Sequence, residues 1–168
     1  MIYPDTFEKK VGFDGVRSEV MRLCLSDAAR RVADMQLQFV NDPEMIRRRL
    51  TSVDEMAAIL GGDTAFPLGA SGDIEELLSR VRPIGTFLGA EELNLVNHSL
   101  RMAAAIADFF SSTARDGHAP YPVLAGIADG IERFDAVTAT ISRSIDRFGD
   151  VKDSASPELE QTRRQLQH

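Results

Sequence analysis

The feature that most restricts the fold of this chain is a long apolar pattern at helical spacing. Through residues 93–110, apolar side chains recur every three or four positions, and a second apolar row runs beside the first. Such spacings place side chains on one face of an α-helix. We predict a helix that is apolar over more than half its circumference and runs through the middle of a helical bundle. The first row is Leu93, Val96, Leu100, Ala103, Ala107 and Phe110, and the second is Leu95, Met102, Ile106 and Phe109.

The same periodicity predicts further helices, each with one apolar stripe facing a core. Two more short helices are expected over residues 123–131 and 134–144. Start and stop signals agree with this pattern: Ser26 precedes a helix, and Asp14 is expected to precede another. Gly61-Gly62 suits a helix end, because glycine adopts left-handed backbone conformations easily. The stripes are Phe13, Val16, Val20 and Leu23; Ile46, Leu50, Val53, Ala57 and Leu60, after an Asp42-Pro43-Glu44 start; and Ile74, Leu77, Leu78 and Val81.

Signals for strands are nearly absent. Only Ile145-Asp146 and Val151-Lys152, on either side of a Phe148-Gly149 turn, could pair as a minimal β-hairpin. The predicted fold class is therefore all-α: an irregular multi-helix bundle with at most one such hairpin near residues 145–152.

Composition excludes several classes of protein. The net charge of −7 argues against a nonspecific nucleic-acid binder, which needs clustered Lys and Arg. No apolar run approaches the ~20 residues of a membrane span. We expect no secretory leader and no membrane partner, hence a cytoplasmic protein. Cys24 is the only cysteine and lies in an apolar pattern, so it is expected to be a small core residue.

No motif in the sequence supports catalysis. The glycine-rich loop over residues 61–72 precedes a helix, but the chain has no Gly-Lys pair to form a phosphate loop. Arg47-Arg48-Arg49 would spread around a helix between Ile46 and Leu50, which are expected to face the core. His98 and His118 lack partners at metal-ligand spacing. The acidic pairs Glu75-Glu76 and Glu91-Glu92 fall in helix first turns. We therefore predict no catalytic residue, no cofactor site and no metal site.

A turn and a helix start lie at residues 145–159. Ser156 can cap the new helix, Pro157 fits its first position, and Glu158 and Glu160 favour its positive end. Because this start has little helix behind it before His168, we expect the chain to be a piece of a longer protein. The predicted hinge comprises Ile145, Gly149, Lys152, Asp153, Ser156 and Pro157.

The sequence resembles the N-terminal part of MutS-like proteins of the second bacterial branch, the branch that carries an Smr domain. The resemblance covers essentially the whole chain and is most specific in its last block, where Ser154 replaces an expected Asn. The matching residues are Tyr3-Pro4, Phe7-Glu8-Lys9, Gly12-Phe13, Leu23-Cys24-Leu25-Ser26, Asp54-Glu55-Met56, Phe66-Pro67, Gly85-Thr86-Phe87-Leu88, Ile145-Asp146, Gly149 and residues 151–159.

This resemblance implies a helical core domain over residues 1–153 and the start of a lever helix over residues 154–168. In the parent protein, the lever leads to a clamp, and the ATPase and Smr nuclease domains follow. The resemblance also implies that the parent binds ATP with Mg, forms a homodimer, and acts on branched or unusual DNA or on ribosomes. Residues 1–168 would then contact the remaining domains of the parent chain.

Three functions stay open from the sequence. The first is a non-catalytic scaffold and lever segment of such an ATP-dependent DNA-binding protein. The second is a stand-alone helical protein–protein interaction module, which needs an exposed apolar patch, with Phe109-Phe110 as one source. The third and weakest is an enzyme, which needs convergent ionisable groups in a deep pocket.

Overall fold

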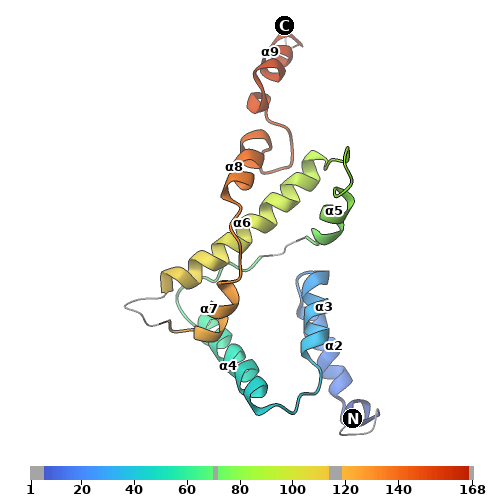
Figure 1. Cartoon of the computed structure of the whole chain (residues 1–168), viewed down its shortest axis with the longest axis vertical. Coiled ribbons are helices and arrows are strands. Elements are labelled where there is room, and N and C mark those ends of the chain that lie inside the picture. Colours follow the sequence, from blue (N-terminus) through green and yellow to red (C-terminus); the bar gives the residue numbers. More distant parts are fainter. Residues whose placement is uncertain (1–5, 70–71, 114–118, 167–168) are drawn as a thin grey trace. The chain divides into compact units, whose positions relative to one another are not determined.

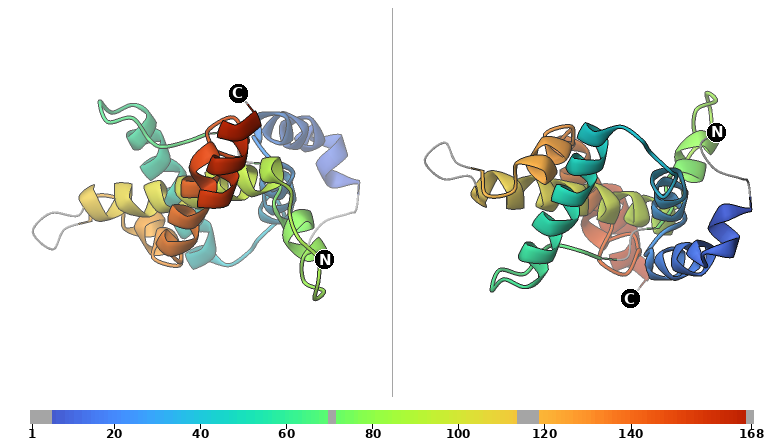
Figure 2. Two further views of the ribbon diagram at one scale, coloured as in Figure 1. Left: turned by 90° about the horizontal axis from the view of Figure 1, so that it is seen from above. Right: turned by 90° about the horizontal axis from the view of Figure 1, so that it is seen from below.

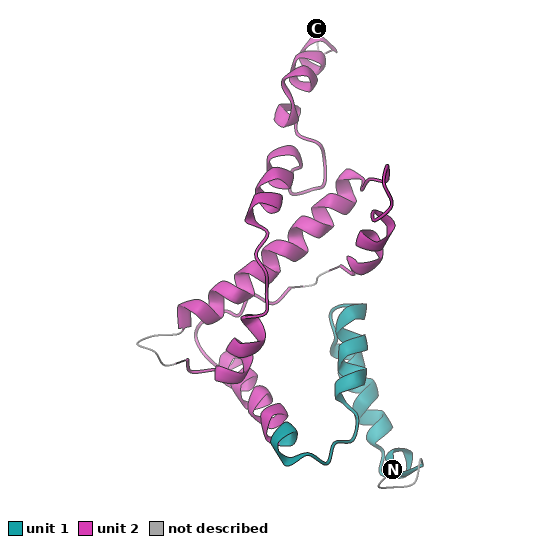
Figure 3. Ribbon diagram, in the orientation of Figure 1, with its two compact units in different colours: residues 1–46 teal, residues 47–168 magenta. Residues whose placement is uncertain are grey.

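All regular structure in the described part of the chain is helical. The computed structural model describes residues 6–69, 72–113 and 119–166, which hold nine α-helices and one short 3₁₀ helix. The chain divides into two compact units, residues 1–46 and 47–168 (Figure 3). The predicted all-α class is confirmed. The division at residue 153, between a core domain and a lever, stays a prediction.

The first unit contains α1 (Phe7–Lys10), α2 (Phe13–Leu23) and α3 (Asp27–Gln36). Ser26 caps α3 as predicted, because its hydroxyl accepts a hydrogen bond from the Ala29 amide at 3.1 Å. The predicted start at Asp14 is wrong: α2 begins at Phe13, after Gly12 in a left-handed conformation. Asp14 therefore lies inside the first turn of α2, where its carbonyl accepts from the Ser18 hydroxyl at 2.9 Å.

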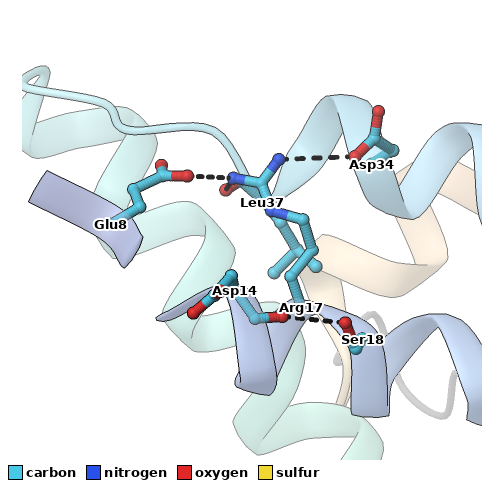
Figure 4. Close-up of polar contacts among 6 residues, drawn as sticks. All are labelled: Glu8, Asp14, Arg17, Ser18, Asp34 and Leu37. Carbon is cyan, nitrogen blue, oxygen red and sulfur yellow. Dashed lines mark hydrogen bonds and ion pairs between the residues drawn. The ribbon is translucent and has the colours of Figure 1, made fainter. Parts of the chain in front are cut away.

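A single arginine ties the three helices of this unit together (Figure 4). Arg17 on α2 contacts Glu8 of α1 at 2.8 Å and Asp34 of α3 at 3.4 Å. The same guanidinium donates to the Leu37 carbonyl, just beyond α3, at 3.3 Å. No sequence pattern pointed to α1 or to this network, because its contacts join residues far apart in the chain.

The second unit begins within α4 (Pro43–Leu60) and continues to the last described residues (Figure 1). Asp42 caps α4 through the Glu44 amide at 2.9 Å, and Gly61 follows its end, as predicted. The remaining elements are α5 (Glu75–Arg80), α6 (Ala90–Thr113), α7 (Pro122–Ala128), α8 (Asp135–Ser144), the 3₁₀ helix η1 (Asp153–Ala155) and α9 (Pro157–Leu166).

Helix α6 is the element on which this unit is built, as its apolar pattern predicted. Near its C-terminal end, Phe109 and Phe110 pack in a buried cluster with Ile59 of α4 and Ala128 of α7. Its N-terminal half packs against α8 (Figure 2). There Asn97 donates to the Ser142 hydroxyl at 3.0 Å. Phe109 and Phe110 are therefore core residues and supply no exposed patch.

The predicted orientation of α4 is wrong. Its apolar stripe, expected to face the core, is exposed: Leu50, Val53 and Leu60 each keep more than 60% of their surface. The buried face instead carries Glu55 and Ile59. Glu55 is buried because both carboxylate oxygens accept backbone hydrogen bonds at the start of α7, from Val123 at 3.1 Å and Leu124 at 2.8 Å. Amides in the first turn of a helix have no acceptor within that helix, so the Glu55 carboxylate supplies the acceptors that these two lack.

The acidic pairs singled out in the sequence lie where they were predicted. Glu75, Glu76, Glu91 and Glu92 lie in the first turns of α5 and α6. Within the described ranges, no helix is long and apolar enough to cross a membrane. Tyr3-Pro4 and His118 lie outside the described residues.

We predict that Glu55→Gln destabilises the second unit. The substitution replaces one of two acceptor oxygens with an amide that faces a backbone N–H, so the expected loss is about 1–3 kcal/mol in free energy of unfolding. Urea unfolding measures the loss, and hydrogen exchange should accelerate at the Val123 and Leu124 amides. The exposed neighbour Asp54→Asn is the matched control, and equal effects of the two substitutions would contradict the role given to Glu55.

Candidate functional site

The stretch between α8 and α9 forms a closed turn. Ile145 and Val151 make an isolated antiparallel bridge. Two backbone hydrogen bonds of 2.9 Å frame it, from Lys152 to the Ser144 carbonyl and from Asp146 to the Asp150 carbonyl. This bridge is the minimal pairing predicted for residues 145–152, and no strand extends from it in the described chain. We call residues 145–151 the exit turn.

The Asp146 side chain accepts hydrogen bonds from the backbone of the exit turn itself. One of its carboxylate oxygens accepts from the Phe148 amide at 2.8 Å and from the Asp150 amide at 3.0 Å. Hydrogen bonds from the Asp150 amide and then the Phe148 amide lower the pKa of this carboxyl, because they favour its charged form.

The tip of the exit turn rests on α6. Gly149 has a φ of +92°, and a Cβ built there would lie 3.4 Å from both Cα and Cγ of Glu91. Two residues earlier along the turn, the Arg147 carbonyl accepts from the Asn94 side chain on α6 at 3.4 Å. The backbone conformation therefore favours glycine at position 149, and the turn lies within ordinary van der Waals contact of α6.

Lys152 ties the segment leaving the turn back to α8. Its ammonium group donates to the Ser142 carbonyl at 2.6 Å, and the Ser142 hydroxyl is the group that Asn97 of α6 contacts. Ser142 therefore lies between α6 and the segment that enters η1. The buried side chains of Ile141 and Ile145 complete this contact region.

Helix α9 starts as the sequence predicted. The Ser156 hydroxyl accepts from the Leu159 amide at 3.2 Å, and Pro157 is the first helical residue. Hydrogen bonds from the backbone amide of Glu158 itself and from the Ser156 side chain lower the pKa of the Glu158 carboxyl. Within the first turns of the helix, acids thus lie where the helix dipole favours them.

A second contact fixes α9 to the exit turn. Arg163, two turns into the helix, forms an ion pair with Asp153 of η1 and donates to the Val151 carbonyl at 3.1 Å. The six predicted hinge residues therefore lie in one stretch that runs from the end of α8 to the first residue of α9. Sequence reasoning missed Asn94, Ser142 and Arg163, because each contributes through a partner distant in the chain.

A hollow of about 640 Å³ lies between the turn and α9, and its two basic side chains, Lys152 and Arg163, are already engaged. Across the described ranges, no group of three or more His, Cys, Asp or Glu residues is placed to hold a metal ion.

The arginine run on α4 and Cys24, also singled out in the sequence, lie outside this region. Arg47 and Arg48 are exposed on α4, with exposed Ile46 and Leu50 on either side, so these two apolar residues do not face the core as expected. Cys24 is half-buried, and its thiol donates to the Val20 carbonyl at 3.3 Å.

The sequence of this chain is similar to sequences of known bacterial proteins. The chain is 30% identical over 143 residues to the endonuclease MutS2 of Alkaliphilus metalliredigens, and 32% identical over 123 residues to that of Shouchella clausii. A third match, to endonuclease MutS2 of Streptococcus mutans, is 27% identical and covers 94% of this chain. These alignments span 16–20% of the length of the relatives. No protein-family model matches the chain, and no solved structure matches it.

The chain is thus a helical segment of MutS-like type. The relatives that it matches over 73–95% of its length are MutS2 proteins, so the chain is MutS2-like. The resemblance drawn from the sequence is confirmed at this level.

We predict that Gly149→Ala destabilises the second unit by about 1–3 kcal/mol, since alanine at this φ is strained. The added methyl group would lie at ordinary van der Waals distance from Glu91, so the expected cost comes from the backbone conformation. Urea or thermal unfolding measures the change.

Gly126→Ala is the matched control for this substitution. Gly126 lies in α7, its φ is not positive, and a Cβ added there would meet no other atom within 4 Å. Alanine there should be neutral or stabilising by up to about 1 kcal/mol. If both substitutions had the same effect, the exit turn would not depend on glycine.

We predict that the exit turn loosens in acid. The pKa of Asp146 is lowered in the folded state, so its stabilising effect is present above its ordinary value of 3.8 and is lost as pH falls through the folded pKa. An NMR titration should show the carboxyl midpoint below the ordinary value, with the Phe148 and Asp150 amide shifts following it. In Asp146→Asn these linked shifts should disappear; if they persist, another group causes them.

Proposed function

We propose that this chain is a non-catalytic scaffold that sets the direction of α9 and carries movement between α9 and the helices behind it. In a MutS2-like protein, α9 would begin the lever that leads to the clamp. The single observation that carries this proposal is the double attachment of the segment after α8. Lys152 and Gly149 fasten the turn to α8 and α6, while Arg163 fastens α9 to the turn.

Close packing makes such an arrangement suitable for transmission. Packed interiors resist compression, so a displacement at one element moves its neighbours. Here the path runs from α6 through Asn94 and Ser142 to the turn, and then through Val151 and Asp153 to Arg163. Every step in it is a hydrogen bond, an ion pair or a van der Waals contact.

The wider activity is proposed for the whole protein. The relatives are named endonucleases, and this chain spans 16–20% of their length. The family resemblance implies that the parent binds ATP with Mg, forms a homodimer and engages DNA or ribosomes. We place the ATP and Mg site, the endonuclease activity and the homodimer contact in parts of the parent other than the residues described here.

A second candidate function is a helical interaction module. The exposed apolar stripe of α4, with Leu50, Val53 and Leu60, supports it, because contiguous exposed apolar residues often mark contact surfaces. In this alternative, partner binding would depend on α4, and the attachment of α9 would have no consequence.

The proposal predicts that Arg163→Ala frees α9 from the exit turn. Loss of the ion pair to Asp153 and of the hydrogen bond to Val151 should increase the picosecond–nanosecond mobility of residues 157–166. We expect lower heteronuclear ¹⁵N order parameters there, with α6 and α8 unchanged.

Arg164→Ala is the matched control, because Arg164 pairs only with Glu160 within α9 among the contacts found in the described chain. It should leave the order parameters at the start of α9 close to their original values. Equal mobility in the two variants would show that Arg163 does not attach the helix.

A further inference from the structure

A second hollow lies where the exit turn meets α6. It has a volume of about 310 Å³, and its lining includes His98 and Arg101 of α6 and Arg147 of the turn. This volume falls at the lower end of the range typical of small-molecule sites. The scaffold role gives no function to these three side chains.

The positions of the basic side chains are fixed by the backbone around them. His98 and Arg101 are three residues apart on α6, so they share one face of that helix. Arg147 reaches the same hollow because Asn94 holds its carbonyl and Gly149 rests on Glu91. The same contacts that seat the exit turn therefore bring a third basic group to this place.

Both arginines keep their hydrogen-bond donors available. Within the described residues, neither Arg101 nor Arg147 forms a salt bridge, although several other arginines in this acidic chain do. The Arg147 guanidinium stacks over the Phe148 ring at 4.6 Å from its centroid. Stacking orders the guanidinium and leaves its in-plane N–H groups free for an acceptor.

The acids near this hollow are few or already engaged. Glu91 is the one acid among the described residues that line it. Glu92, on the next position of α6, is paired with Arg80 and accepts from the Gly89 amide. The local charge is thus positive in a chain whose net charge is −7.

A further hollow, with apolar side chains in its lining, adjoins the basic one. It has a volume of about 400 Å³, shares His98 and Arg101, and is otherwise lined by Leu68, Met102 and their neighbours. A ligand longer than a phosphate ion can therefore place a charged group between the arginines and an organic group beside Leu68 and Met102.

We infer that the paired hollows around His98, Arg101 and Arg147 bind a phosphate ester. Guanidinium groups suit this ligand, because their planar N–H pairs match phosphate oxygens. The phosphate belongs either to a free nucleotide or to a nucleic-acid backbone. This inference is independent of the scaffold role, since a chain that holds α9 need not bind any ligand.

The test uses the 168-residue chain and NMR titrations with inorganic phosphate, AMP and a short single-stranded oligonucleotide. We expect amide shifts at Asn94, His98, Arg101 and Arg147, with AMP or the oligonucleotide binding several-fold more tightly than inorganic phosphate. Tighter binding of AMP than of each nucleotide unit of the oligonucleotide identifies a nucleotide site, and the reverse order identifies a backbone site. Either order supports the inference.

Variants separate this site from general charge attraction. Arg101→Ala and the double variant with Arg147→Ala should weaken binding by at least about fivefold and tenfold, respectively. Arg48→Ala, an exposed arginine on α4 that does not line either hollow, should change it less than about twofold. Absence of shifts at these residues, or equal weakening by Arg48→Ala, would overturn the inference. Circular dichroism confirms that each variant is folded.

Discussion

The exit turn and the start of α9 depend on the contact between Gly149 and the first turns of α6. A glycine at φ +92° lets the exit turn lie flat on Glu91, and this brings the Arg147 carbonyl to Asn94. With the turn seated, Lys152 reaches the Ser142 carbonyl, and the backbone bridge between Ile145 and Val151 closes. The start of α9 and the basic hollow both take their positions from this one close approach.

Much of the fold follows from local sequence signals. Helices α2, α4, α5 and α6 appear where apolar spacing predicts them, and α3 follows the start signal at Ser26. The caps at Ser26, Asp42 and Ser156 form with their own helices. These signals are local because the hydrogen bonds involved span two or three residues. The exit turn belongs to the same class, since Asp146 folds it through amides only two and four residues away.

What the sequence could not reveal was which face of a helix is buried. The apolar stripe of α4 predicts a core-facing side, yet Glu55 is buried and Leu50 is exposed. The reason is non-local: the carboxylate completes two amides of α7 that lie nearly seventy residues further along the chain. The same limit applies to the exit turn. Asn94, Ser142 and Arg163 each contact residues ten or more positions away in the chain, and no spacing rule identifies such partners.

The central claim is that the exit turn keeps α6, α8 and α9 in a fixed orientation relative to one another, so that the three helices move together. Residual dipolar couplings of the backbone N–H groups test it directly, because they report the orientation of each helix in a common frame. The account predicts that a single alignment tensor fits the couplings of residues 90–113, 135–144 and 157–166. A separate tensor for α9, or couplings in α9 averaged towards zero, would contradict it.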